Sequence, residues 1–346
     1  MYIVRLVLNP ALCQTWRDET TLQIGATPGL ATVLGGLGQV ERSVVTAMNG
    51  QHDLQALREL AVELGGTAAT ADRVVDVLMS SGSAVDIDQA GSDVPSPSHS
   101  EQRRVPEQSS VGLQERSPDG GRSALQARGR LQVEVNGAGR IGAQVARLLA
   151  AAGIGEVTVD DPAPVQAADV CPGGLPTEAM GRARDRTLNS RLRADALSPS
   201  PLPQGGTPDF VVLAPTSGTG RDEAADLLRL GIPHLLVQVL EITGVVGPLV
   251  VPGESSCLRC HDLHRTDRDR HWPLLLDQLA RRPPSEPACD IALSATVAGL
   301  ASVQALAHLD GFVAAAVDGT IEVTLPYGLP RRRSWARHRD CGCGWE

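Results

Sequence analysis

Residues 131–161 read LQVEVNGAGRIGAQVARLLAAAGIGEVTVDD. Alternating valines lead into a group of glycines, apolar residues then recur at helical spacing as far as Gly153, and a second apolar run ends at Asp160. This order predicts a strand, a glycine turn, a helix and a second strand. Such a unit is typical of nucleotide-binding proteins.

The turn itself carries the pattern G-x-G-x-x-G. Missing side chains there let a phosphate approach the backbone N–H groups at the positive end of the helix. An acidic side chain at the end of the second strand can accept hydrogen bonds from a ribose. The residues predicted to contact a nucleotide are therefore Gly137, Gly139, Arg140, Gly142, Asp160 and Asp161. The motif alone does not separate ATP from NAD.

The composition limits what the chain does. Its 346 residues are enough for two domains, and 42% hydrophobic with 21% charged residues is ordinary for a globular protein. All 31 basic residues are arginine, which excludes a Schiff-base lysine and a P-loop lysine. A net charge of −9 argues against nucleic acid as a partner. Because no stretch approaches the roughly 20 apolar residues of a bilayer span, we expect no membrane association and a cytoplasmic protein.

Residues 1–90 have the pattern of a small winged-helix-like module. We expect a hairpin from short strands at 1–7 and 20–24, followed by helices at 40–48, 53–64 and 70–79 with N-caps at Asp53 and Thr70. The runs WRDETTLQ (16–23) and MNGQHDL (48–54) resemble the PqqD-like leader-peptide clamp of peptide-modifying systems. A clamp of that kind pairs an extended peptide with a sheet edge. A packing or dimerisation domain is the alternative.

The remaining chain divides at about residue 128. Residues 91–128 are rich in Ser, Pro, Gly, Gln and Arg and offer too little apolar area to offset their ordering entropy, which predicts a disordered linker. Residues 129–346 alternate apolar strands with helices and predict an α/β domain with a doubly wound, mostly parallel sheet covered on both faces. Its expected elements are strands at 209–213, 235–239, 245–251 and 320–325 and helices at 221–230 and 291–309.

Two cysteine pairs need a chemical explanation in a cytoplasmic protein. Four thiolates in two close pairs suit a tetrahedral structural Zn²⁺, so the predicted metal ligands are Cys257, Cys260, Cys341 and Cys343, with the first pair on a loop. Residues 257–261 also read C-x-x-C-H, the pattern for attaching a c-type haem, which would leave the second pair unexplained. The His- and Asp-rich run at 261–271 is interpreted as a solvated crossover loop in preference to a second metal site.

The order of these motifs resembles the ThiF/MoeB superfamily, the ubiquitin-activating-type adenylyltransferases, over residues 131–343. The stretch GPLVVPG (247–253), followed by CLRCHDLHRTDRDRHWP, is similar to the cyclodehydratase-associated branch of bacteriocin and thiazole/oxazole peptide modification. The resemblance implies a Rossmann-like domain of ThiF type, ATP with Mg²⁺, a homodimer, and a peptide or small carrier protein as substrate. It also makes Arg184 the replacement of a phosphate-contacting lysine and places Cys289 before the dimer-forming helix. These two residues are the catalytic candidates.

Other positions depart from the family pattern. Residues 168–172 supply neither the Asn nor the Arg that the family carries after its second strand, and residues 213–217 lack its magnesium-binding aspartate. Such groups stabilise charge on a transferring nucleotide. Three hypotheses follow: a catalytically degenerate scaffold that binds a peptide or carrier protein for a partner modifying enzyme, an active ATP-dependent adenylyltransferase acting on a C-terminal carboxylate, and an NAD-dependent oxidoreductase.

Overall fold

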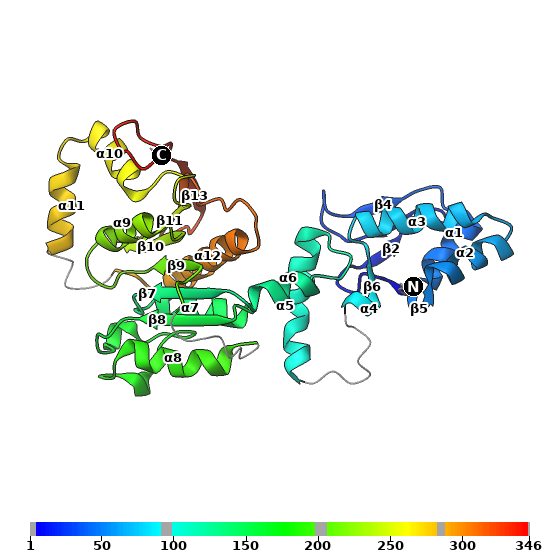
Figure 1. Ribbon diagram of the computed structural model, residues 1–346, viewed down its shortest axis with the longest axis horizontal. Coiled ribbons are helices and arrows are strands. Elements are labelled where there is room, and N and C mark those ends of the chain that lie inside the picture. The colour runs from blue at the N-terminus through cyan, green and yellow to red at the C-terminus, as the bar shows by residue number, and fades with distance from the viewer. Residues whose placement is uncertain (1–4, 91–98, 198–205, 282–287, 345–346) are drawn as a thin grey trace. The chain divides into compact units, whose positions relative to one another are not determined.

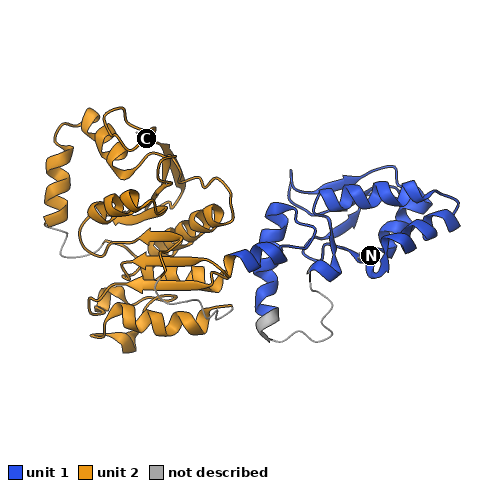
Figure 2. Ribbon diagram, in the orientation of Figure 1, with its two compact units in different colours: residues 1–127 blue, residues 128–346 orange. Residues whose placement is uncertain are grey.

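The computed structural model describes residues 5–90, 99–197, 206–281 and 288–344. The chain forms two compact units, residues 1–127 and 128–346, which Figure 2 shows in separate colours. Each unit has its own hydrophobic core, and we describe each by itself.

Unit 1 combines two small antiparallel sheets with helices. The sheets have the strand orders β5-β1-β6 and β2-β3-β4. The apolar residues of α3 recur at helical spacing, so that Ala71, Val74, Val75 and Leu78 are buried together in the core. The elements are β1 (Arg5–Leu8), β2 (Gln14–Trp16), β3 (Leu22–Ile24), β4 (Thr32–Leu34), α1 (Gln39–Ala47), β5 (Asn49–Asp53), α2 (Leu54–Glu63), α3 (Ala68–Ser80), β6 (Ala84–Asp86), α4 (Ile87–Ala90), α5 (His99–Glu115) and α6 (Arg122–Arg128).

The expected helices of unit 1 are present, but its strands pair differently from the prediction. The hairpin of the two predicted strands is wrong, because β1 pairs with β5 and β6 whereas β3 pairs with β2 and β4. Asp53 caps α2 as predicted, accepting a hydrogen bond from the Ala56 N–H at 2.7 Å. Thr70 is not an N-cap. Helix α3 starts at Ala68, and the Thr70 hydroxyl lies 3.1 Å from that of Thr67 within the first turn.

The predicted disordered linker is wrong for residues 99–128, which form α5 and α6; its remaining residues, 91–98, lie outside the described part of the chain. The Ser-Pro-Asp-Gly-Gly run that indicated a linker is the turn between these helices. Asp119 accepts hydrogen bonds from the N–H groups of Gly121 and Ser123, both at 2.9 Å. A Cβ on Gly121 would overlap the backbone of α5, so glycine here permits close packing rather than flexibility.

Unit 2 contains a seven-stranded mixed sheet with the order β13-β12-β11-β10-β9-β7-β8. Strands β8, β7, β9 and β10 are parallel, and β11, β12 and β13 continue antiparallel. Figure 1 labels most of its elements. They are β7 (Gln132–Asn136), α7 (Gly142–Ala151), β8 (Glu156–Asp160), η1 (Ala167–Asp169), η2 (Thr177–Ala179), α8 (Arg184–Asp195), β9 (Phe210–Leu213), α9 (Arg221–Leu230), β10 (His234–Leu240), β11 (Thr243–Val250), α10 (Leu258–Arg268), α11 (Trp272–Arg281), α12 (Ile291–Leu309), β12 (Gly319–Thr324) and β13 (Pro330–Ser334).

Helices cover both faces of this sheet. On one face α7, α8 and α12 pack on β7, β8, β10 and β11 around Val135, Leu149 and Val297. On the other, α9 and α10 pack on β9, β10 and β11 around Val211 and Leu227. The predicted α/β class with a doubly wound sheet is therefore confirmed.

Helix α12 corrects one expectation from the sequence. An 18-residue stretch of this 19-residue helix has a mean hydropathy of 1.4, so that by length and composition the helix is able to cross a membrane. In the fold it is a core helix, because Leu293, Val297 and Ala301 are fully buried in the cluster shared with α7 and β11. Its apolar composition is explained by that packing.

The buried His234 at the start of β10 makes the stability of unit 2 depend on pH. Burial lowers the pKa of this imidazole below its ordinary value of 6.5, and Nδ1 lies 2.9 Å from the Ile232 carbonyl oxygen. Below pH 6.5 the unfolded chain binds a proton that folded His234 does not, so the free energy of unfolding falls as the pH falls towards the folded pKa.

His234→Asn keeps a donor near the Nδ1 position but does not titrate. Urea unfolding at several pH values below 6.5 is expected to give a shallower decline for this variant than for the wild type, by at most about 1.4 kcal/mol per pH unit. Equal slopes for the two proteins would contradict the assignment of His234 as a neutral buried group.

Candidate functional site

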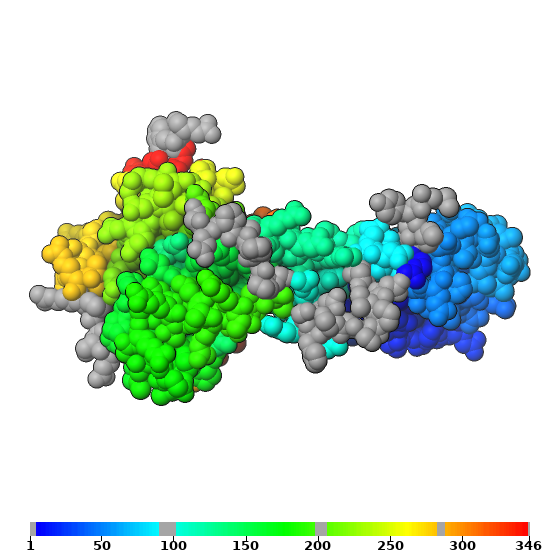
Figure 3. Space-filling model, turned by 60° about the horizontal axis from the view of Figure 1, so that its bottom comes forward, coloured from blue at the N-terminus to red at the C-terminus, as the bar shows by residue number. Residues whose placement is uncertain are grey.

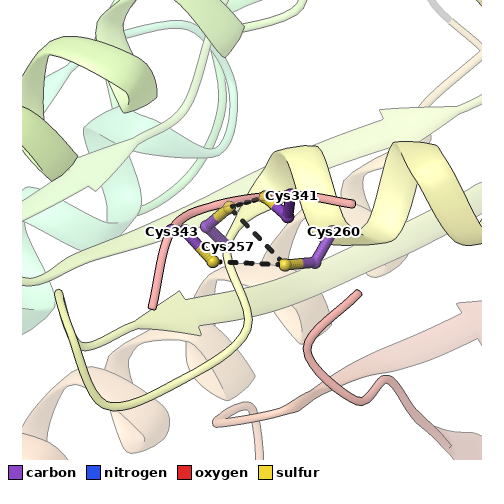
Figure 4. A group of neighbouring side chains, drawn as sticks. All are labelled: Cys257, Cys260, Cys341 and Cys343. Carbon is purple, nitrogen blue, oxygen red and sulfur yellow. Dashed lines mark hydrogen bonds between the residues drawn. The ribbon is translucent and has the colours of Figure 1, made fainter. Parts of the chain in front are cut away.

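Four cysteine side chains converge beside α10, from segments more than eighty residues apart. Cys257 immediately precedes α10, Cys260 lies in its first turn, and Cys341 and Cys343 follow β13. Their Sγ atoms all lie within 4.8 Å of one another and point toward a common centre, as Figure 4 shows. The first pair is therefore partly helical rather than on a loop, contrary to the prediction.

The spacing of the sulfurs fits a tetrahedral metal. A zinc ion about 2.3 Å from four sulfurs requires S–S separations of about 3.8 Å. The observed separations are 3.8 Å for Cys257–Cys260 and 3.4 Å for both Cys257–Cys341 and Cys260–Cys343. Hydrogen bonding from Cys257 holds the pKa of Cys260 below its ordinary value, which favours a thiolate at this position. The cluster is able to hold a metal.

His261, the histidine of the C-x-x-C-H pattern, belongs to the core of this region. It is buried, its ring stacks on Trp335 with centroids 4.9 Å apart, and Nε2 lies 3.2 Å from the Ser256 hydroxyl. Burial lowers its pKa to about 3. Because both cysteines of the pattern already face the second pair, this arrangement favours a four-thiol metal site over haem attachment.

The His- and Asp-rich run is not a crossover loop, because residues 258–268 form α10. His264 and Asp267 lie close to His338 of the C-terminal segment. Nδ1 of His338 accepts a hydrogen bond from the Asp340 N–H at 3.1 Å, so Nε2 carries the proton and donates to Asp267 at 3.0 Å. These contacts fasten the C-terminal segment to α10 and leave His338 without a free lone pair for a second metal.

The glycine turn lies between β7 and α7, as predicted. Gly137 adopts φ +96°, and a Cβ there would overlap the Ala214 carbonyl oxygen at the end of β9. Asp161 is buried, and its Oδ2 accepts a hydrogen bond from the Ala138 N–H at 2.8 Å. One of the two predicted acids therefore fixes the turn itself, whereas Asp160 is exposed at the end of β8.

Arg184 is buried beneath this turn and bound to two carboxylates. Its guanidinium nitrogens lie 3.0 Å from Asp161 Oδ2 and 2.7 Å from Asp169 Oδ2, with side-chain exposures of 6%, 6% and 11%. Nη1 also donates to the Thr216 hydroxyl at 3.1 Å. A Cβ on Gly139 would lie 2.7 Å from Thr216 Cγ2 and 3.5 Å from Asp169 Oδ1. The carboxylates thus adjoin the part of the turn predicted to contact phosphate.

Two further candidates, Arg140 of the glycine turn and Cys289, bond to backbone carbonyl oxygens. The Nε of Arg140 donates to the Ala168 carbonyl oxygen at 2.9 Å, so its side chain is fixed along the turn. Cys289 precedes α12, and its Sγ lies 3.7 Å from the Asp290 carbonyl oxygen. Burial raises the pKa of the Cys289 thiol, which keeps it protonated and weakly nucleophilic at neutral pH.

Sequence reasoning missed three residues that define these sites. Asp169 and Thr216 were noted only as departures from the family pattern, yet both bind Arg184. His338 lies within the arginine-rich C-terminal segment, where no spacing distinguishes it. Asp169 and Arg184 both depart from the family pattern and lie close in sequence. Opposite charges at these two positions were the signal from which the ion pair could have been predicted.

The fold and the sites together define a class: an α/β protein with a glycine turn at the first strand of its parallel sheet and a four-thiol cluster that joins α10 to the C-terminus. No protein-family model and no curated protein sequence matches the chain. Its fold, however, is that of several solved structures.

E. coli MccB bound to ATP has a TM-score of 0.72 with 14% sequence identity, over 98% of this chain and 99% of that chain. MccB with AMPCPP and MccA gives 0.73 and 14%, over 98% and 99%. PaaA gives 0.65 and 16%, over 95% and 99%. At these low identities the likenesses show a shared fold, and they do not select a family or a branch.

Proposed function

We propose that this chain is a peptide-binding scaffold with the adenylyltransferase fold, whose nucleotide site has lost the charges needed for catalysis. The observation that carries the proposal is the pairing of Arg184 with both Asp161 and Asp169. One guanidinium faces two carboxylates, so the ionised cluster has one excess negative charge. A cationic clamp for phosphate needs the opposite sign.

The position of this cluster strengthens the argument. Asp169 Oδ1 would lie 3.5 Å from a Cβ on Gly139, so a phosphate at the turn would meet a carboxylate there. Thr216 stands where the family carries a magnesium-binding aspartate, which leaves a metal–triphosphate complex without that ligand. The residues present do not reproduce the family's set for ATP and Mg²⁺.

Peptide binding is proposed on two grounds. MccB, which has this fold, has been solved with the peptide MccA. In addition, β2 is an edge strand of its three-stranded sheet, all three of its residues are exposed, and Trp16 is 45% exposed. An extended peptide is able to pair with such an edge through backbone hydrogen bonds. A cavity of about 930 Å³ adjoins this strand between Trp16, Asp18 and Arg42 of α1.

The finer parts of the proposal are a partner modifying enzyme of the cyclodehydratase type, a homodimer, a structural zinc and a cytoplasmic setting that keeps the thiols reduced. A small carrier protein is an alternative substrate. An active adenylyltransferase is the second candidate function, because the MccB structures with ATP and AMPCPP have the same fold.

ATP affinity tests the charge argument. Asp169→Asn keeps an oxygen for Arg184 and removes one negative charge, so we expect ATP to bind about tenfold more tightly, equivalent to about 1.4 kcal/mol. Gly139→Asp adds a carboxylate at the turn and is expected to abolish ATP binding. Isothermal titration calorimetry of the full-length protein with ATP measures the affinity of the wild type and of both variants.

Asp222→Asn is the matched control, because it removes the same formal charge from an exposed position in the first turn of α9. It should leave ATP affinity unchanged. Weak binding that is equal for ATP and NAD, and equal in all variants, would mean that the turn has only a structural role.

A further inference from the structure

A basic pocket lies on the outer side of α8, between this helix and η2. We call it the α8 pocket; its volume is about 550 Å³. The residues that matter here are Glu178, Arg182, Arg186, Thr187, Ser190 and Arg191. Figure 3 shows the face of the molecule to which α8 contributes, in green at the lower left.

The arginines of this pocket differ from Arg184, whose guanidinium group forms ion pairs inside the protein. Within the described part of the chain, no ion pair is formed by Arg182, Arg186 or Arg191. With Glu178 as the acid in the lining, the pocket has a formal charge of +2 on a chain whose net charge is −9. Like charges gathered without partners cost energy, so an anionic occupant would be stabilised here.

The hydroxyl groups of the pocket do not supply donors. Thr187 donates to the Ala183 carbonyl oxygen and Ser190 to that of Thr187, both at 2.9 Å. Recognition therefore falls to the guanidinium groups, whose planar forks bind carboxylates in bidentate fashion.

The size of the pocket favours a ligand with several charges over a single small anion. Arg186 and Arg191 are five residues apart on α8, which separates them by about 7.5 Å along the helix axis and by about 140° around it. Arg182 precedes the helix, so the three arginines surround the pocket and do not form one row. A volume of about 550 Å³ lies in the range of sites for ligands much larger than one phosphate.

We propose that the α8 pocket binds an acidic segment of a peptide that carries more than one carboxylate. The inference rests on the proposed peptide-binding function. It adds that the peptide segment bound by unit 2 is negatively charged. It concerns a surface different from the edge strand of unit 1 and from the glycine turn.

Fluorescence anisotropy with the full chain tests the proposal. The probe is a fluorescein-labelled synthetic peptide with Glu at every second position and Ser between, and its control has Gln in place of Glu. The Glu peptide is expected to bind, and more weakly at about 200 mM than at about 50 mM salt because the contacts are charged. The Gln peptide should not bind.

The variant Arg182→Gln/Arg186→Gln/Arg191→Gln is expected to weaken binding of the Glu peptide at least about tenfold. The matched control is Arg229→Gln/Arg281→Gln/Arg339→Gln, which removes the same charge at arginines that are 76%, 76% and 89% exposed. This control should retain the affinity. Melting curves compare the folding of both variants, and Arg186→Gln alone provides a milder change.

Equal loss in both triple variants would overturn the proposal, because only net charge would then matter. Displacement of the Glu peptide by inorganic pyrophosphate at equal concentration would also overturn it, in favour of a small-anion site. The ATP series reports on the glycine turn and this titration on the α8 pocket, so failure of one is distinguishable from failure of the other.

Discussion

Elemental analysis of purified, reduced protein is expected to give one zinc ion per chain. The physical reason is the convergence of four thiols from two segments, with three Sγ–Sγ distances of 3.4–3.8 Å and all four Sγ atoms within 4.8 Å of one another. Three of the four cysteines are buried, which limits loss of the ion to solvent. A folded, reduced and metal-free preparation would contradict this expectation.

Cys260→Ser should lower the melting temperature of unit 2 by roughly 10 °C or more. Structural zinc contributes about 10–16 kcal/mol in small zinc peptides, and for a unit of this size 1 kcal/mol shifts the melting temperature by about 2–4 °C. Cys257, Cys260 and Cys341 also belong to the core cluster beneath α9 and α10, so losing the ion would loosen that packing. Differential scanning calorimetry measures the shift.

Cys13→Ser is the matched control, because Cys13 is exposed in unit 1. It should leave both the zinc content and the melting temperature unchanged. A different result is conceivable: Cys260→Ser could have the melting temperature of the wild type but a lower zinc content. The ion would then occupy the cluster without stabilising the fold.

The sequence predicted the metal cluster because its signal is local and chemical. Two close cysteine pairs in a reduced setting have few other uses. The supports of the cluster were not predictable in this way. Trp335 and His338 act through contacts with His261 and Asp267 on α10, about seventy residues earlier in the chain, and such pairings leave no periodic pattern.

The same difference between local signals and long-range contacts explains which other parts of the fold were predicted correctly. Helix α9 matches its predicted range because its apolar periodicity and its glycine C-cap, Gly231, lie in consecutive residues. Helix α12 matches its predicted range because its run of small and apolar residues is continuous. Strand partners in unit 1 depend on which segments meet in three dimensions, and the predicted hairpin failed there. In residues 99–128, composition alone was misleading, because glycines at 112 and 121 serve close helix packing.

Labelled pyrophosphate is expected not to exchange into ATP above background when the full chain is mixed with ATP, Mg²⁺ and pooled synthetic heptapeptides that together present every residue at a free C-terminus. Adenylation of a carboxylate releases pyrophosphate and is reversible, so an active enzyme would exchange the label. Loss of one donor to a developing charge typically costs about a hundred- to a thousandfold in rate. Here Arg184 is held by two carboxylates and donates to the Thr216 hydroxyl. Thr216 lies in the segment 213–217, where the family resemblance implies a magnesium-binding aspartate.

Thr216→Asp should not restore exchange. The new carboxylate would join Asp161 and Asp169 around a single guanidinium, adding negative charge where the phosphates need positive charge. The combination Thr216→Asp/Asp169→Asn provides the metal ligand at unchanged net charge and is the fairer test of latent activity. Robust exchange by the unmodified protein would overturn the scaffold proposal. Arg184 would then have to leave its carboxylates when ATP binds, since a guanidinium held by both cannot also neutralise a leaving pyrophosphate.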